Sequence, residues 1–329
     1  MLRAPPAPPA GSAPSTRKAP SMSSPFGHAR LIANPRAGRA RAGRRTLEQL
    51  RAALDGYGVE HDAVETRDPD DAAQRAREAV AEGIRYLVAV GGDGTLGGVV
   101  DGLFEHDAAI APDLVVGAVP TGTGADFTRT VGVHVRPDLA AKRLAAPQTM
   151  DIDVGIVTCT GPDGAKVERH FVNCGQVGYG AEVVRIAARL PRALGRFRYL
   201  FSAWGGIRAV RRSSARLGLA HAARTEDIVE LVVANGQFFG GGMRVAPRAL
   251  PDDGRFNVLA FTGDRGQVFR LTTRLFHGQH LPNPQISEWQ SPHVDVDATP
   301  PMAVEADGEP LGRTPASFRL LRGALAFKV

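Results

Sequence analysis

The stretch that determines the fold is Tyr86-Leu-Val-Ala-Val-Gly-Gly-Asp-Gly-Thr95, in which an apolar run leads directly into glycines and an aspartate. An apolar run such as Tyr86–Val90 is typical of a buried parallel strand, so the glycines fall in the turn where that strand ends. Glycines there let backbone N–H groups approach a phosphate, and a following helix directs its positive end to the same place. Asp93 adds a carboxylate, which beside phosphates favours Mg²⁺. The stretch therefore predicts a phosphoryl-transfer loop, and it is not a Walker A loop because no Gly-Lys-Ser/Thr follows.

Strand and helix patterns alternate on both sides of this loop. The sequence predicts further strands at 30–33, 59–66 and 114–119 and helices at about 46–57 and 70–82. Such alternation favours a doubly wound parallel sheet with ligands at the carboxyl ends of its strands. The turns Asn34-Pro-Arg-Ala-Gly38 and Pro120-Thr-Gly-Thr-Gly124 are expected at that same edge.

The pattern changes after about residue 150. Short β-rich segments follow at 151–160, 168–174, 227–234, 255–261, 293–296, 302–305 and 316–321, with one helical stretch at 181–212. We therefore predict an α/β plus mainly β fold, in which a doubly wound domain (28–150) precedes a β-sandwich-like domain (151–329). This prediction allows the last segment of the second domain to pack against the first domain.

Composition narrows the class of protein. The chain has 329 residues, 43% hydrophobic and 22% charged, which is typical of a globular protein, and it has no apolar stretch long enough to span a bilayer. Residues 1–27 are rich in Pro and Ala and lack both apolar periodicity and a signal-peptide core, so we expect a disordered tail on a cytoplasmic protein. Cys159 and Cys174 are expected to be buried free thiols.

Charge is distributed unevenly. Residues 1–45 carry nine Lys/Arg and no acid, and the acid-free segment 183–225 is rich in arginine. Lysine is absent from the glycine-rich turns, so a phosphate cradle must use backbone amides, arginine and metal. Apolar residues keep helical spacing from Leu190 to Ile207, which leaves two interpretations open: a helix packed on the β-rich domain, or a surface that binds anionic membranes. The basic tail lacks interleaved aromatic residues, so no nucleic-acid partner is expected.

Five motifs occur in an order that carries a resemblance. They are Asn34-Pro-Arg-Ala-Gly38, Gly91-Gly-Asp-Gly-Thr95, Gly122-Thr-Gly-Ala-Asp-Phe127, Asn235-Gly-Gln-Phe-Phe-Gly-Gly-Gly-Met243 and Asp307-Gly-Glu309. Together they resemble the diacylglycerol kinase catalytic family, the bacterial soluble lipid kinases that are also similar to sphingosine kinases. The resemblance covers nearly everything after residue 28. The second motif alone is less specific, because NAD kinases and phosphofructokinases have similar loops.

The resemblance implies an ATP-binding first domain, a lipid-holding second domain and an active site in the cleft between them. The residues implied to bind the nucleotide are Asn34, Thr66, Gly92, Asp93, Gly94, Thr95, Gly122, Thr123 and Gly124. Asp93, Asp126 and Asp153 match the acidic positions that hold Mg²⁺, mostly through water. The turn Leu250-Pro-Asp-Asp-Gly-Arg255 resembles one that binds a second, structural Mg²⁺ through an Asp side chain, here Asp253, and two backbone carbonyls.

For the chemistry, the resemblance implies that Asp307 is the general base, with Glu309 beside it. The implied activity is an ATP- and Mg²⁺-dependent lipid kinase that phosphorylates a hydroxyl of a diacylglycerol-like or sphingoid lipid. Such a protein is expected to be cytoplasmic and peripherally associated with an anionic membrane surface. The sequence does not name the lipid, and it leaves a homodimer open.

Two departures from the family pattern keep alternatives open. Leu96-Gly97-Gly98 stands where the family has x-Asn-Glu, and Ala125 replaces the Asn before Asp126. These changes put nucleotide affinity in question. One alternative is a lipid-binding protein on the same fold that has lost catalysis, and another is a soluble kinase of the NAD-kinase type.

Overall fold

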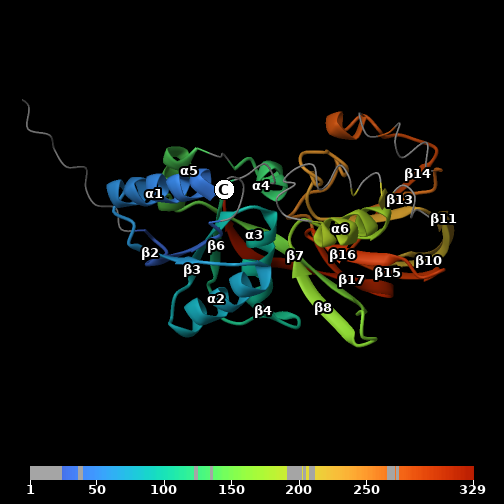
Figure 1. Cartoon of the computed structure of the whole chain (residues 1–329), viewed down its shortest axis with the longest axis horizontal. Helices are drawn as coiled ribbons and strands as arrows, with labels where there is room; N and C mark the ends of the chain where they lie inside the picture. Colours follow the sequence, from blue (N-terminus) through green and yellow to red (C-terminus); the bar gives the residue numbers. More distant parts are fainter. Residues whose placement is uncertain are drawn as a thin grey trace, which may run out of the picture.

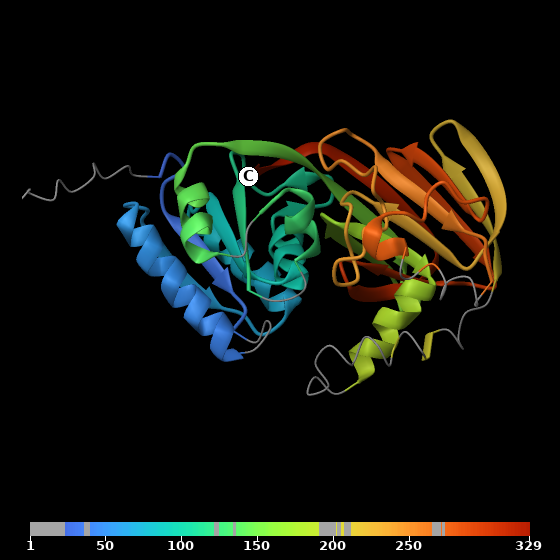
Figure 2. The same cartoon turned by 90° about the horizontal axis from the view of Figure 1, so that it is seen from above.

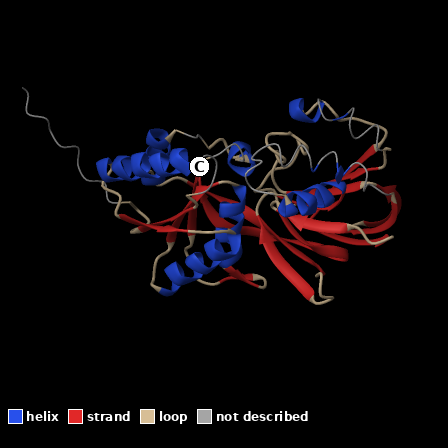
Figure 3. Cartoon of the chain, viewed as in Figure 1, coloured by secondary structure: helices blue, strands red, loops and turns tan. Residues whose placement is uncertain are grey.

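The computed structural model describes residues 24–35, 40–121, 125–133, 136–190, 202, 205–206, 212–264, 271 and 274–329. Within this part of the chain, fifteen strands join into one continuous sheet, and β4 (Phe104–Glu105) and β5 (Ala108–Ala109) form a separate small ribbon. Helices lie on both sides of the sheet in the N-terminal half, whereas the C-terminal half is mainly strands (Figures 1 and 3). The predicted α/β plus mainly β class is confirmed.

The N-terminal half is a parallel sheet in the order β17-β6-β3-β1-β2. Its strands are β1 (Ala29–Ala33), β2 (His61–Glu65), β3 (Tyr86–Gly91), β6 (Val115–Pro120) and the end of β17 (Glu309–Lys328). The buried residues of α1 (Ala40–Gly56) and α5 (Pro137–Ala145) pack on one face, and those of α2 (Pro69–Ala81) and α3 (Asp93–Gly102) on the other. Helices on both faces of a parallel sheet are the predicted doubly wound arrangement.

The C-terminal half is antiparallel and folds over on itself as a sandwich. One layer contains β9 (Cys174–Gly178), β12 (Glu230–Ala234), β13 (Phe256–Phe261), β14 (Ile286–Ser291) and β16 (Ala303–Ala306). The other contains β7 (Thr149–Thr160), β8 (Lys166–Phe171), β10 (Ser213–Leu219), β11 (Ala222–Ile228), β15 (His293–Thr299) and most of β17. A single apolar core lies between the layers, with Val177 and Val258 from the first and Val157 and Phe318 from the second.

Two long strands connect the halves. β17 pairs antiparallel with β7 from Arg313 opposite Thr160 to Lys328 opposite Thr149, and its end pairs parallel with β6. Figure 2 shows both strands running from one half into the other. The last segment of the chain thus returns to the first half, and the predicted boundary at residue 150 falls inside a strand that both halves share.

The predicted strand at 168–174 is divided into β8 and β9. The amides of Val172, Asn173 and Cys174 donate to the carboxylate of Asp307, so this segment leaves the regular ladder between the two strands. The predicted helix at 181–212 begins as α6 (Tyr179–Arg189). Most of the proposed apolar stripe after it lies outside the described residues.

Other sequence predictions can be placed directly. Cys159 and Cys174 are buried and free. Residues 1–23 of the predicted tail lie outside the described part, whereas the ring of Phe26 lies 5.5 Å from that of Tyr86. Among the described residues, no helix has the length and apolarity that a bilayer crossing requires.

Helix α3 differs from the expectation, because it begins at Asp93 and not behind the glycine motif. Gly97 and Gly98 therefore lie in its middle. A Cβ at Gly98 would lie 2.3 Å from the carbonyl oxygen of Pro69, and one at Gly102 would lie 2.3 Å from that of Ala73. These two glycines, one helical turn apart, let α3 approach α2 closely, which offsets their low helix propensity.

We predict that Gly98→Ala destabilises the fold by about 1–3 kcal/mol, because the added methyl group must push α3 away from α2. The control is Gly56→Ala, a helical glycine with no atom within 4 Å of its Cβ position. That change should be neutral or stabilise by about 0.5–1 kcal/mol. Urea unfolding of the three proteins measures both effects, and a Gly98→Ala protein as stable as the wild type would contradict the close helix contact.

Candidate active site

The carboxyl ends of β2, β1, β3 and β6 lie side by side at one edge of the sheet. Asn34 follows β1 and donates its N–H to Val90 at 3.0 Å, and Thr121 follows β6 and donates its N–H to Gly91 at 3.0 Å. Thr66 follows β2 in the same way. The structure thus brings Asn34, Thr66 and the glycine turn to one edge, as the sequence predicts, while Gly122, Thr123 and Gly124 lie outside the described residues.

Two hydroxyl groups at this edge lack partners within the described part of the chain. They are those of Thr66 and Thr121, whose oxygens are buried without a hydrogen bond. A buried hydroxyl without a partner costs about 1–3 kcal/mol, so a ligand with polar oxygens fits this edge. Thr95 differs, because its side chain packs behind the turn, where a Cβ on Gly91 would lie 2.3 Å from its hydroxyl oxygen.

Asp93 and Asp126 form the acidic centre of the edge. Asp93 occupies the first turn of α3, and its carboxylate accepts from the amides of Asp126 at 2.9 Å and Phe127 at 3.2 Å, at the start of α4 (Asp126–Thr130). The carboxylate of Asp126 accepts in turn from the amide of Gly241 at 2.8 Å. The two acids thus link α3, α4 and the glycine-rich segment of the C-terminal half.

The negative charges of Asp93 and Asp126 repel each other. Burial raises the pKa of both carboxyls, and the nearby charge of Asp93 helps to raise the pKa of Asp126 to about 6. Arg129 acts in the opposite direction on both. A cation beside the pair would relieve this repulsion, so Asp93 and Asp126 fit a hydrated Mg²⁺.

Asp153, the third predicted acid, is held by two turns of the C-terminal half. Its side-chain oxygens accept from the amides of Gly254 and Gly323, each at 2.7 Å, and both glycines have left-handed φ. Among the described residues, no group of three or more His, Cys, Asp or Glu is arranged to hold a metal. The turns at 251–254 and 321–325 therefore fix the side chain of Asp153, and its part in a water-mediated Mg²⁺ set with Asp93 and Asp126 stays a prediction.

The turn predicted to bind a structural Mg²⁺ lies beside Asp153. Asp253 accepts from the amide of Arg255 at 3.0 Å, and the amide of Asp153 donates to the carbonyl of Pro251 at 2.6 Å. Burial and then the charge of Asp153 raise the pKa of Asp253. A cation held by Asp253 and the carbonyls of Leu250 and Arg255 is compatible with this excess of negative charge.

Asp307 lies in the turn between β16 and β17, in the left-handed region at φ 47°. Its carboxylate accepts from three consecutive amides, those of Val172 at 2.9 Å and of Asn173 and Cys174 at 3.0 Å each. The loss of solvent around this partly buried carboxyl outweighs these bonds and raises the pKa of Asp307 to about 7. The charge of Asp93 adds to the rise, which links this carboxyl to the acidic centre.

Helix α3 faces both residues of the predicted catalytic pair. A Cβ at Gly97 would lie 3.2 Å from the carboxylate of Asp307, and one at Gly94 would lie 3.7 Å from the carboxylate of Glu309. Gly97 thus leaves room beside the predicted base, and a larger side chain there would press on it.

Three residues of this region are missing from the sequence predictions. Asn173 donates to the carbonyl of Phe238 at 2.9 Å, Glu305 accepts from the amide of Gly308 at 2.8 Å, and Arg129 pairs with Asp126 at 3.3 Å. Burial raises the pKa of Glu305 to about 8. Of these three residues, only Arg129 could have been found from the sequence, because it follows Asp126 at helical spacing.

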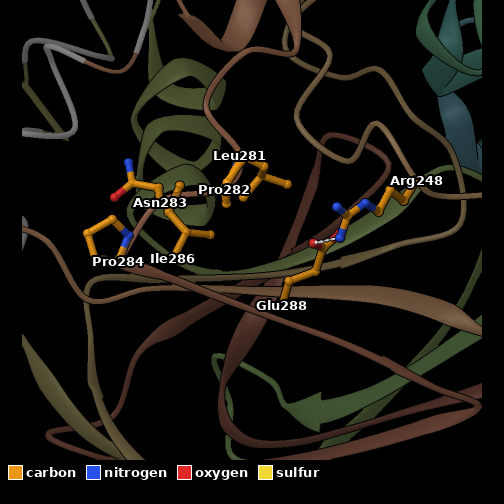
Figure 4. A pocket seen from close by; sticks show the side chains of 7 residues that line it. All are labelled: Arg248, Leu281, Pro282, Asn283, Pro284, Ile286 and Glu288. Atoms are coloured by element: carbon orange, nitrogen blue, oxygen red, sulfur yellow. Dashed lines mark hydrogen bonds and ion pairs between the residues drawn. The ribbon is translucent and has the colours of Figure 1, made fainter.

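A separate cavity of about 450 Å³ lies at the start of β14 (Figure 4). It is lined by Arg248, Leu281, Pro282, Asn283, Pro284, Ile286 and Glu288. Arg248 and Glu288 form an ion pair at 2.6 Å. None of these residues belongs to the predicted site.

We predict that Asp153→Ala destabilises the protein by about 3 kcal/mol, because it leaves two amides without their charged acceptor. Asp252→Ala in the neighbouring turn is the control, and an exposed change of this kind should stay within about 0.5 kcal/mol of the wild type. Chemical unfolding in metal-free buffer measures both. An Asp153→Ala protein of wild-type stability would show that these bonds do not anchor the turns.

Known protein families and solved structures match most of this chain. Residues 28–157 match the diacylglycerol kinase catalytic domain, and residues 174–329 match the YegS C-terminal NAD kinase beta sandwich-like domain. A diacylglycerol kinase structure from Bacillus anthracis str. Sterne is similar with a TM-score of 0.67 and 20% identity, over 93% of this chain and 97% of the other. The likeness to this solved structure concerns the fold alone.

Two curated relatives are similar to most of this chain. The chain is 30% identical over 291 residues to a protein of Escherichia fergusonii named probable lipid kinase YegS, covering 84% of this chain and 90% of the relative. It is 30% identical over 286 residues to one of Xanthomonas axonopodis pv. citri named probable lipid kinase YegS-like, covering 83% and 87%. The chain therefore belongs to the YegS lipid kinase family, with a diacylglycerol kinase catalytic domain followed by a β-rich C-terminal domain.

Proposed function

We propose that this lipid kinase uses ATP and Mg²⁺ to phosphorylate a hydroxyl of a diacylglycerol-like or sphingoid lipid. The observation that carries the proposal is the position of Asp307. Its partly buried carboxyl has a pKa of about 7 and lies beside α3, next to the acidic centre. We call the sheet edge formed by the carboxyl ends of β2, β1, β3 and β6, where the nucleotide phosphates are proposed to bind, the phosphate edge. A general base is most effective when its pKa is near the working pH.

The residues of this chain have separable tasks in that reaction. Asp307 accepts the proton of the lipid hydroxyl while three backbone amides keep its carboxylate in place. Asp93 and Asp126 would hold Mg²⁺, which when bound neutralises charge on the phosphates. The glycine turn and the hydroxyls of Thr66 and Thr121 provide the edge for the nucleotide.

The lipid is expected on the side of the β-rich half, which supplies Asp307. We further propose that the protein works in the cytoplasm at an anionic membrane surface, since segment 183–225 is rich in arginine and free of acids. A homodimer is compatible with this arrangement. The alternative of a lipid-binding protein without catalysis rested partly on Gly97-Gly98 replacing the family's Asn-Glu. Gly98 has a packing role of its own against α2, which weakens that argument.

We predict that labelled ATP and a total lipid extract yield a phosphorylated lipid with the wild-type protein. Asp307→Asn should reduce the rate about 100-fold or more, because the base is lost, and Asp93→Ala should do so by disturbing the Mg²⁺ position. Asp252→Asn, an exposed acid, is the control. Thin-layer chromatography and mass spectrometry identify the product.

Transfer that survives both substitutions would overturn the assignment. Lipid binding without stabilisation by ATP would support the lipid-binding alternative, and phosphorylation of a soluble nucleotide cofactor would support the NAD-kinase type.

We also predict that Mg²⁺ binding weakens in acid. Asp126 has a pKa of about 6, so its cation-binding form is lost as the pH falls through that value. Affinity at pH 5 should be about tenfold lower than at pH 7, because only the carboxylate binds the metal. Calorimetric titration without nucleotide measures it, and Asp126→Asn should weaken binding at pH 7. An affinity independent of pH between 5 and 7 would exclude Asp126 as a metal position.

A further inference from the structure

The glycine-rich turns at the phosphate edge contain no lysine, and Arg36 of the first turn lies outside the described residues. The four lysines are Lys18, Lys142, Lys166 and Lys328, and none lies in a glycine-rich turn. At the acidic centre, Arg129 is the cation whose charge acts on both Asp93 and Asp126. Among the described residues, Arg129 thus lies close to both acids, and the sequence predictions gave it no role.

Arg129 lies on the last turn of α4 and is close to Phe238 and Gly242 of the C-terminal half. Its Nη1 lies 3.3 Å from Oδ1 of Asp126, and the centre of its guanidinium lies 5.5 Å from the ring centroid of Phe238. A Cβ at Gly242 would lie 2.4 Å from Nη1 of Arg129. Glycine at 242 is therefore what allows the guanidinium to extend over this segment.

The side chain of Arg129 makes fewer and longer hydrogen bonds than those of Arg30 and Arg319. Arg319 makes two bonds of 2.7 Å to Asp107, and Arg30 binds Asp62 at 2.5 Å and Glu82 at 2.7 Å. Within the described residues, the side chain of Arg129 makes one hydrogen bond of 3.3 Å, and it is 44% exposed. A guanidinium has five N–H donors, so Arg129 can bind an anion and keep its contact with Asp126.

We propose that Arg129 is a catalytic residue that binds the transferred γ-phosphoryl group. This inference rests on the proposed function. The planar fork of N–H donors matches two oxygens of a phosphoryl group, and its fixed charge offsets the negative charge of the transition state. The ring of Phe238 and the backbone of Gly242 limit where the guanidinium can lie, which keeps it beside the acidic centre.

The transfer balances without a chemical change in Arg129. The lipid oxygen forms a bond to the γ-phosphorus as the bond from that phosphorus to the β,γ-bridging oxygen breaks. The hydroxyl proton goes to Asp307, and ADP leaves with the electron pair of the broken bond. Arg129 donates hydrogen bonds to non-bridging oxygens throughout.

The first test compares ATP with ADP, because only ATP carries the group that Arg129 would contact. Arg129→Gln keeps a donor for Asp126 but removes the charge. We expect ATP to bind about tenfold more weakly to this variant, as for loss of a charge-assisted bond, with ADP binding unchanged. Arg136→Gln, an exposed arginine just before α5, is the control and should bind both as the wild type does. Equal changes for ATP and ADP, or none, would overturn the proposal.

The second test measures transfer. Arg129→Gln should lower kcat about 100-fold or more, with little change in KM for the lipid, and Arg129→Ala should regain activity when guanidinium ions are added at millimolar concentration. A merely structural arginine predicts that Arg129→Gln retains activity and that guanidinium gives no rescue, and either result would overturn the inference. If the wild type transfers nothing, the proposed function fails, whereas a wild type that transfers and an unaffected Arg129→Gln would reject only the role of Arg129.

Discussion

The arrangement of the active site depends on one carboxylate, that of Asp307, and the three consecutive amides that it accepts from. These amides belong to residues 172–174, so the bonds interrupt the strand between β8 and β9 and fix the turn that begins β17. β17 then continues along β7 into the parallel sheet of the N-terminal half. The same contact that positions the predicted base therefore also connects the C-terminal half to the sheet edge that is proposed to bind the phosphates.

The other acids of the region follow the same physical rule. Each carboxylate is held by backbone amides of a different element: Asp93 by the start of α4, Asp126 by Gly241, and Asp153 by two left-handed glycines. Amides fix geometry without neutralising charge, so pKa values remain raised where acids meet, as at Asp126 and Asp307. Negative charge that is positioned but not compensated suits a site that receives a cation and a proton.

The sequence predicted the features that depend on local pattern. Tyr86–Val90 and its glycines indicated the parallel sheet and its ligand edge, because periodicity and turn chemistry are local. It could not predict the close contact at Gly98, which depends on the neighbouring helix, nor the start of α3 at Asp93. The anchoring of Asp153 by the amides of Gly254 and Gly323 was likewise hidden, because these glycines lie about 100 and 170 residues away in the chain. Such long-range contacts leave no periodic signal.

The most direct measurement is the pKa of the Asp307 carboxyl, followed by ¹³C NMR through a pH titration of protein labelled at its aspartate carboxyl carbons. Asp307→Asn assigns the signal. The expected result is a pKa of about 7, which reflects burial acting against three amide bonds. A value near the ordinary 3.8 would contradict the central claim, because a carboxyl of that kind would be too weak a base for the lipid hydroxyl.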